Sequence, residues 1–159
     1  MDKSETGEVR TQPVHLREFT LSSVDMSEIA NYVLHGAAQI TPAIVEKVLR
    51  SLPIWKVEFT QINAPHFPHL VDQLEFLAAV VEDAAEGAYK DLPYAALAAA
   101  VFAITYAHRK VDIIPDTILE LGFSDDSGIA RAVLIMHERA LRKYAEKNDF
   151  DWEKITSKP

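Results

Sequence analysis

Apolar residues recur at intervals of three and four along most of this chain, which is the spacing of an amphipathic α-helix. The clearest stretch runs from His69 to Gly87 and has one apolar stripe opposite a row of acids; the stripe is formed by Leu70, Leu74, Leu77 and Val81. Strand-like alternation is nearly absent, and the chain has five glycines. The pattern therefore predicts an all-α fold, a single compact bundle of about six helices joined mostly by short loops.

Helix-end signals divide the first half of this pattern into elements. The first helix is predicted to begin between residues 22 and 25 and to end near Gly36. Its inner stripe is predicted to consist of Ile29, Val33 and Leu34. Thr41 then has the side chain of an N-cap, with Pro42 in the first turn of the next helix. Residues 54–65 fit either a strand or a helix, and their helical neighbours favour a helix.

The second half of the chain contains the longest run without a charge, the sixteen residues 92–107, which are rich in alanine. A membrane-spanning helix needs about 20 apolar residues, so we predict a buried central helix and no membrane span. The last long helix is predicted over residues 127–147, and the tail after it is predicted to pack Phe150 and Trp152 back onto the bundle.

The length of 159 residues suits one domain with a sizeable core. We interpret residues 1–20 as a flexible N-terminal arm and residues 21–159 as a single helical domain. The first residues contain no apolar segment of the kind found in a secretory signal. The chain has no cysteine, which excludes disulfides and thiolate chemistry. Both features fit a cytoplasmic protein.

The net charge is −8, from 16 Lys and Arg against 24 Asp and Glu. Nucleic acids and anionic lipids both attract basic surfaces, so neither is an expected partner. The charges are also segregated: residues 72–91 hold six acids and one lysine, whereas residues 129–147 hold five Lys and Arg and two acids. Such a surface could drive self-association or present an acidic face to a basic partner. The alternative is two solvated helix faces.

The stretch VDIIPDTILELGFSDD, residues 111–126, carries four aspartates and one glutamate and has no Lys or Arg. Pro115 suits the first turn of a helix, and Asp116 beside it places negative charge at a helix N-terminus. Residues 114–121 are therefore predicted to form a short helix between the aspartates, and Gly122 is predicted to end it.

The other aspartates of this stretch also fall at predicted helix ends. Asp112 follows the end of the central helix, and Asp125 or Asp126 caps the last helix by accepting hydrogen bonds from its free N–H groups. The favoured interpretation is therefore that the acids are structural caps. The alternative is a cluster that binds Mg²⁺, Ca²⁺ or Mn²⁺ in a metal-dependent enzyme or sensor, with His108 or His137 as a neighbour. The spacing does not match the calcium loop of an EF-hand.

The same region resembles the core of the YkvA-like bacterial family, domain of unknown function 1232, over about residues 97–133. The family pattern is an apolar helix of small residues, then Asp-x-Ile-Pro-Asp, a short apolar span and Leu-Gly-x-x-Asp-Asp. The matching positions are Asp112, Ile114, Pro115, Asp116, Leu121, Gly122, Asp125 and Asp126. Family members often carry Ser-Pro before the first aspartate, where this chain has Arg109 and Lys110, and such charges are costly inside a membrane. The resemblance implies an α-helical fold and a bacterial origin, and it implies no activity.

Other chemical motifs are few. His66, His69 and Asp72 have a spacing that could bind Zn²⁺ from one helix face. Prolines at 65 and 68 interrupt any helix there, which favours solvated or capping histidines. No G-x-S-x-G elbow, P-loop or glycine-rich phosphate fingerprint occurs.

These observations favour a non-catalytic helical protein, without a metal or cofactor, that acts by binding another protein or a second copy of itself. A small acidic bundle without cysteine is a form often taken by immunity- and antitoxin-like proteins, which cover a partner's site. That comparison rests on the type of protein and not on a motif.

Overall fold

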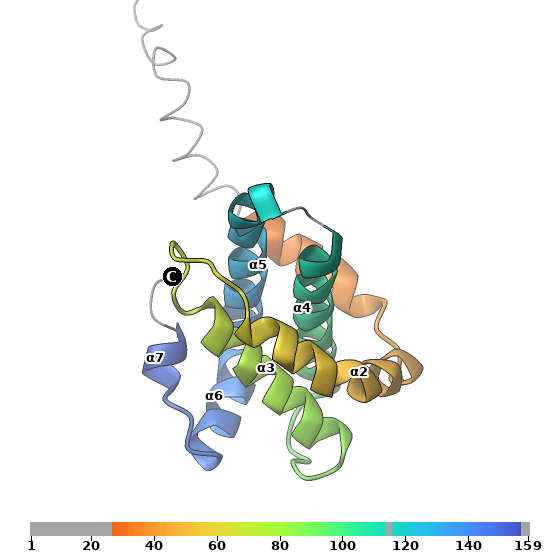
Figure 1. Ribbon diagram of the computed structural model, residues 1–159. Coiled ribbons are helices and arrows are strands. Elements are labelled where there is room, and N and C mark those ends of the chain that lie inside the picture. The colour runs from red at the N-terminus through yellow and green to blue at the C-terminus, as the bar shows by residue number, and fades with distance from the viewer. Residues whose placement is uncertain (1–26, 114–115, 157–159) are drawn as a thin grey trace, which may run out of the picture.

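The computed structural model describes residues 27–113 and 116–156, and it leaves out the side chains of residues 110–125. The predicted N-terminal arm lies outside the described residues. All regular structure in the described part is helical, which confirms the predicted all-α bundle. In Figure 1 the helices pack around a central one, α4 (Tyr94–Ile113). Its neighbours include α2 (Pro42–Thr60), α3 (Leu70–Ala85) and α5 (Asp116–Met136).

The alanines of α4 explain its central position. Six of them are buried along the helix: Ala96, Ala98, Ala99, Ala100, Ala103 and Ala107. Small side chains allow neighbouring helices to approach closely, and close packing of this kind is what protein interiors require. The predicted buried central helix is therefore confirmed. Within the described ranges, no helix is long and apolar enough to cross a membrane.

A helix over residues 27–38 packs against α4 and α5 through two glycines. A Cβ on Gly36 would overlap Cε1 of Phe102, and a Cβ on Gly128 would lie 2.8 Å from Cδ1 of Ile29. The prediction that Gly36 ends this helix is wrong, because the helix continues to residue 38 and the glycine serves a close helix–helix contact. Leu34 was expected inside but is 55% exposed.

The beginning of α2 confirms the predicted cap, since Oγ1 of Thr41 accepts a hydrogen bond of 3.2 Å from the N–H of Ile44. The helix then passes through Pro53 without ending, so residues 54–60 are helical, as favoured. Pro53 cannot donate a hydrogen bond to the carbonyl four residues earlier. Leu52 and Phe59 are both 0% exposed, and their burial holds the helix on either side of the missing hydrogen bond.

The apolar stripe of α3 is buried as predicted, and Gly87 ends the segment with a positive φ of 86°. This left-handed residue is the expected helix stop. The N–H of Gly87 donates to the carbonyl of Ala84 at 3.3 Å. The turn directs the chain toward the start of α4.

The aspartate stretch folds differently from the prediction. In the described part of the predicted short helix, residues 116–121, no separate helix occurs; residues 116–136 form one helix, α5, which continues through Gly122. Glycine inside a helix costs about 1 kcal/mol relative to alanine. The second half of α5 is packed, with Ile129, Val133 and Leu134 buried. Burying each such side chain contributes about 1.5–3 kcal/mol, which outweighs the glycine.

The bounds of α4 and α5 also contradict the predicted positions of Asp112, Asp125 and Asp126 at helix ends. Asp125 and Asp126 both lie inside α5, where their backbone N–H groups belong to the helix and no terminus needs a cap. Asp112 lies in the last turn of α4, one residue before its end, and does not follow the helix. Asp116 is the first residue of α5, so the helix start expected beside Pro115 is confirmed for Asp116.

The predicted last helix is divided at His137 (φ −120°, ψ 34°), after which α6 (Glu138–Lys147) takes a new course. No glycine or proline marks this break. Tertiary contacts explain it: Leu141 and Tyr144 are buried, and the hydroxyl of Tyr144 donates to Oδ2 of Asp83 on α3 at 2.6 Å. The chain bends so that α6 reaches α3.

The tail folds back as predicted. Asp149 is left-handed (φ 62°), and the N–H of Phe150 donates to the carbonyl of Ala145 at 2.9 Å, which is a Schellman turn. The turn places Phe150 and Trp152 on Phe76 of α3, with ring centroids 5.1 and 6.0 Å apart. Trp152 begins the short final helix α7 (Trp152–Thr156).

The segregated charges are largely paired within the chain. Glu82 binds Lys56 of α2 at 3.0 Å. Asp72 lies 3.6 Å from Lys154, and Asp91 lies 3.6 Å from Lys147. Half-exposed pairs of this kind contribute little each, typically about 0–1 kcal/mol. The acidic segment 72–91 is therefore mostly engaged with other helices and does not form an open acidic face.

Candidate functional site

Two aspartates of the motif are separated along one helix. Asp116 opens α5, and Asp126 lies ten residues farther along the same helix, which is about 15 Å at 1.5 Å per residue. Ligands of one metal ion lie about 2.0–2.6 Å from it, and this separation of the two backbone positions is several times larger. Asp126 is 2% exposed. Pro115 and the side chains of Asp112, Asp116 and Asp125 lie outside the described residues.

The two histidines proposed as neighbours lie far apart. His108 is near the C-terminal end of α4, and His137 is in the joint between α5 and α6, beside the start of α4. Nδ1 of His108 lies 2.8 Å from Oε1 of Glu58, and its ring stacks on Trp55 with centroids 4.0 Å apart. This cluster joins α4 to α2. Sequence reasoning missed Glu58, because fifty residues separate it from His108 and no local pattern links them. His137 directly follows the C-terminal end of α5. It lies about 16 Å from Asp126 along the helix axis, so it is not a neighbour of that aspartate.

The zinc candidate does not form a site. His69 is the N-cap residue of α3 and makes no side-chain capping bond, while Asp72 pairs with Lys154. Among the residues that the structure describes, no group of three or more His, Asp or Glu side chains is arranged to hold a metal ion.

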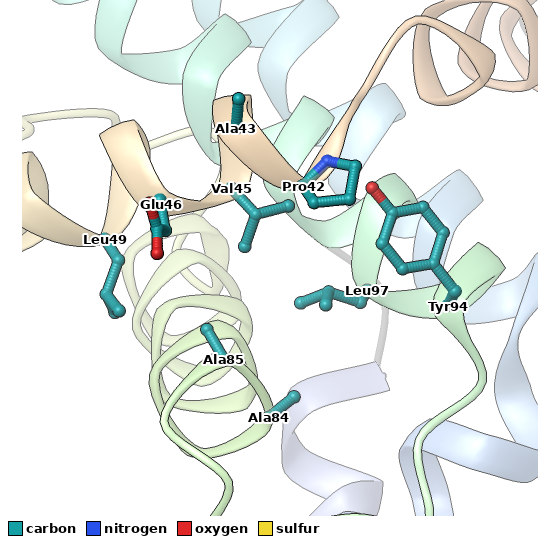
Figure 2. Close-up of a pocket in the computed structure, with 9 residues that line it drawn as sticks. All are labelled: Pro42, Ala43, Val45, Glu46, Leu49, Ala84, Ala85, Tyr94 and Leu97. Atoms are coloured by element: carbon teal, nitrogen blue, oxygen red, sulfur yellow. The ribbon is translucent and has the colours of Figure 1, made fainter.

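A pocket of about 490 Å³ lies where α2 begins, α3 ends and α4 begins (Figure 2). Its apolar walls come from three helices: Val45 and Leu49 of α2, Ala84 and Ala85 of α3, and Leu97 of α4. Tyr94 stands at one side, and its hydroxyl donates to the carbonyl oxygen of Ile40 at 2.9 Å. The Tyr94 bond ties α4 to the connection that precedes α2.

Three local signals place these helix ends. Thr41 caps α2, Gly87 turns the chain after α3, and Pro93 begins α4 by accepting hydrogen bonds from the N–H groups of Ala96 and Leu97 at 3.0 and 3.1 Å. Each signal was readable in the sequence. Their meeting around one pocket was not, because it depends on how α2, α3 and α4 pack.

Glu46 determines the electrostatics of the pocket, because it is the only charged residue among those that line it. Its side chain is exposed, and the ion pairs formed between described residues do not involve it. The two helix N-termini and one C-terminus here carry partial charges of about half a unit each. Their sum of about +0.5 is smaller than the full negative charge of Glu46. The pocket therefore favours a basic group with an apolar stem.

Comparison with known proteins gives no indication of function. No family model, curated protein or solved structure matches this chain. The resemblance of residues 97–133 to the YkvA-like family stays a prediction.

Burial lowers the pKa of His137 from its ordinary value of 6.5. Below pH 6.5 the unfolded chain therefore binds a proton at this residue that the folded protein does not bind, so the stability falls as the pH falls through this range. We expect a smaller loss of unfolding free energy for His137→Gln than for the wild type between pH 7 and about pH 5. Urea denaturation at a series of pH values measures this difference.

The control for this titration is His35→Gln, which removes an exposed histidine and should follow the wild type. A pH dependence in His137→Gln as steep as that of the wild type would show that burial of His137 does not influence acid stability.

Proposed function

We propose that this protein acts by binding a basic segment of another protein, with a lysine or arginine of the partner inserted between α2, α3 and α4. The aliphatic stem of that residue would lie on Val45, Leu49 and Leu97, and its charge would meet Glu46. The observation that carries the proposal is the single carboxylate at a pocket whose other lining residues are uncharged. The net charge of −8 supports it, because it favours the approach of a basic partner.

The solvent face of α2 extends the same surface. Ile54 and Val57 are 67% and 58% exposed. They follow Glu46 at eight and eleven residues, which places them on the same side of the helix over about 16 Å. Exposed apolar side chains grouped on one helix face are typical of protein-binding surfaces. A partner laid along α2 would cover this face and fill the pocket.

The kind of protein that fits this activity is a small, cytoplasmic, non-catalytic binder that covers a basic site on its partner, as immunity- and antitoxin-like proteins do. The support is the acidic charge, the helical bundle and the pocket with Glu46. The comparison is one of type. A YkvA-like, bacterial origin belongs to the same proposal.

Selection from a random dodecapeptide phage library on the purified chain tests the proposal. We expect the selected peptides to carry Lys or Arg and to bind Glu46→Gln about tenfold more weakly than the wild type, a loss of about 1.4 kcal/mol. The amide keeps the shape of the side chain and removes its charge. Isothermal titration calorimetry measures the affinities, and added salt should weaken binding to the wild type more than to the variant.

Glu153→Gln is the matched control, because it makes the same change at an exposed residue of α7 outside the pocket. It should bind the peptides like the wild type. Selected peptides without basic residues, or equal affinities of Glu46→Gln and the wild type, would refute the proposal.

A further inference from the structure

A second pocket, of about 310 Å³, is also lined by Tyr94 and borders the helix over residues 27–38, the start of α4 and the joint between α5 and α6. Val33, Leu34, Ala95, Ala98 and Met136 are among the residues that line it. We infer that the partner segment carries a second anchor, a large uncharged apolar side chain that inserts here while its basic residue occupies the pocket with Glu46. This inference rests on the proposed function and specifies the partner further.

The second pocket offers no charge at neutral pH. Its titratable lining residues are His137 and Tyr94. Burial lowers the pKa of His137, so its imidazole is neutral, and the Tyr94 hydroxyl donates to the carbonyl of Ile40. A lysine or arginine would gain no opposite charge in this pocket and would lose hydration. An apolar side chain such as leucine, methionine or phenylalanine would gain contact with the walls.

Tyr94 is the element that the two pockets share, since it lines both of them. Figure 2 shows its ring at one side of the pocket that contains Glu46. The Tyr94 hydroxyl is bonded to the carbonyl of Ile40, which borders the second pocket, and Pro42, the first residue of α2, borders the first pocket. A segment that crosses the exposed edge of Tyr94 would therefore reach both pockets.

We place the two anchors on opposite faces of the Tyr94 ring, and the thickness of the ring then sets their spacing. Carbon atoms in contact with opposite sides of one ring are about 7–8 Å apart, at 3.5–4.0 Å on each side. Residues i and i+2 of an extended chain are about 6.6–6.8 Å apart and point to the same side. We therefore expect a basic and a large apolar residue two positions apart in the selected peptides.

Two variants fill the second pocket from different helices: Ala95→Trp on α4 and Ala38→Trp on the helix over residues 27–38. Both alanines line the pocket and are exposed, so the larger side chain enters the pocket without disturbing the core. Glu153→Trp on α7 is the control. We expect both filling variants to bind the selected peptides about tenfold more weakly and the control to bind them unchanged.

Variants of the selected peptides, combined with the protein variants, form a double-mutant cycle. Replacing the apolar anchor by alanine should weaken binding to the wild type by a similar factor and should have little further effect on either filling variant, because the two changes remove the same contact. Circular dichroism shows which variants are folded. Because the two substitutions lie on different helices, one folded variant is enough to test whether the second pocket binds the apolar anchor.

Unchanged affinity of a folded filling variant, together with weaker binding to Glu46→Gln, would overturn the second anchor and leave the basic site standing. Unchanged affinity of Glu46→Gln would overturn the proposed function itself.

Discussion

Phe76→Ala is expected to lower the free energy of unfolding by about 3–5 kcal/mol, as truncation of a fully buried phenylalanine does. Phe76 is 0% exposed, and its ring lies edge-on to those of Tyr144, Phe150 and Trp152, with centroids 5.8, 5.1 and 6.0 Å away. These three rings belong to α6 and the tail. One side chain of α3 therefore holds the C-terminal segment of the chain in place, and urea denaturation measures what it contributes.

Phe67→Ala is the matched control, because it removes the same atoms from a half-buried phenylalanine in the connection between α2 and α3. Its expected cost is about 1 kcal/mol, in proportion to the smaller apolar area lost. In a Trp55→Phe background, the remaining fluorescence of Trp152 should shift to the red in Phe76→Ala. Equal losses of stability for the two variants would show that Phe76 does not hold the tail.

Gly36→Ala is expected to destabilise the protein by about 1–3 kcal/mol, the cost of inserting a methyl group into a packed interface. Helix propensity alone predicts the opposite sign, a gain of about 1 kcal/mol. The new Cβ would overlap Cε1 of Phe102. The ring of Phe102 is also packed against Tyr32 and Tyr106, with centroids 5.5 and 6.3 Å away, so it cannot move aside freely.

A double-mutant cycle separates the two contributions. In a Phe102→Ala background the clash is absent, and Gly36→Ala should become neutral or stabilising, which reverses its sign. Thermal and urea denaturation of the four proteins measure the coupling. A stabilising Gly36→Ala in the wild-type background would mean that the first helix does not approach α4 as closely as described.

Sequence reasoning succeeded where structure depends on a few adjacent residues. The cap formed by Thr41, the left-handed turn at Gly87 and the apolar stripe of α3 are such cases. A capping side chain and a positive φ are decided within one turn of helix, and a stripe reflects the helical period itself. The burial of α4 followed in the same way from the uncharged, alanine-rich run of residues 92–107.

Sequence reasoning failed where packing outweighed a local signal. Gly36 and Gly122 were predicted to end helices, yet each lies inside a helix, and α2 also continues through Pro53. Glycine costs a helix about 1 kcal/mol and proline about 3 kcal/mol, whereas each buried large side chain contributes about 1.5–3 kcal/mol. The break at His137 has the opposite origin, because it has no local signal and follows from the contacts of α6 with α3.

By itself the sequence determined the all-α class, the acidic charge, the lack of thiol chemistry and the local caps, since these depend on composition or on neighbouring residues. Only the tertiary structure decided that Asp116 and Asp126 are separated along one helix and that Glu46 stands alone on a pocket bordered by Tyr94. The pocket joins three helix ends from distant parts of the chain. Their meeting depends on side-chain packing among α2, α3 and α4, which no short stretch of sequence encodes.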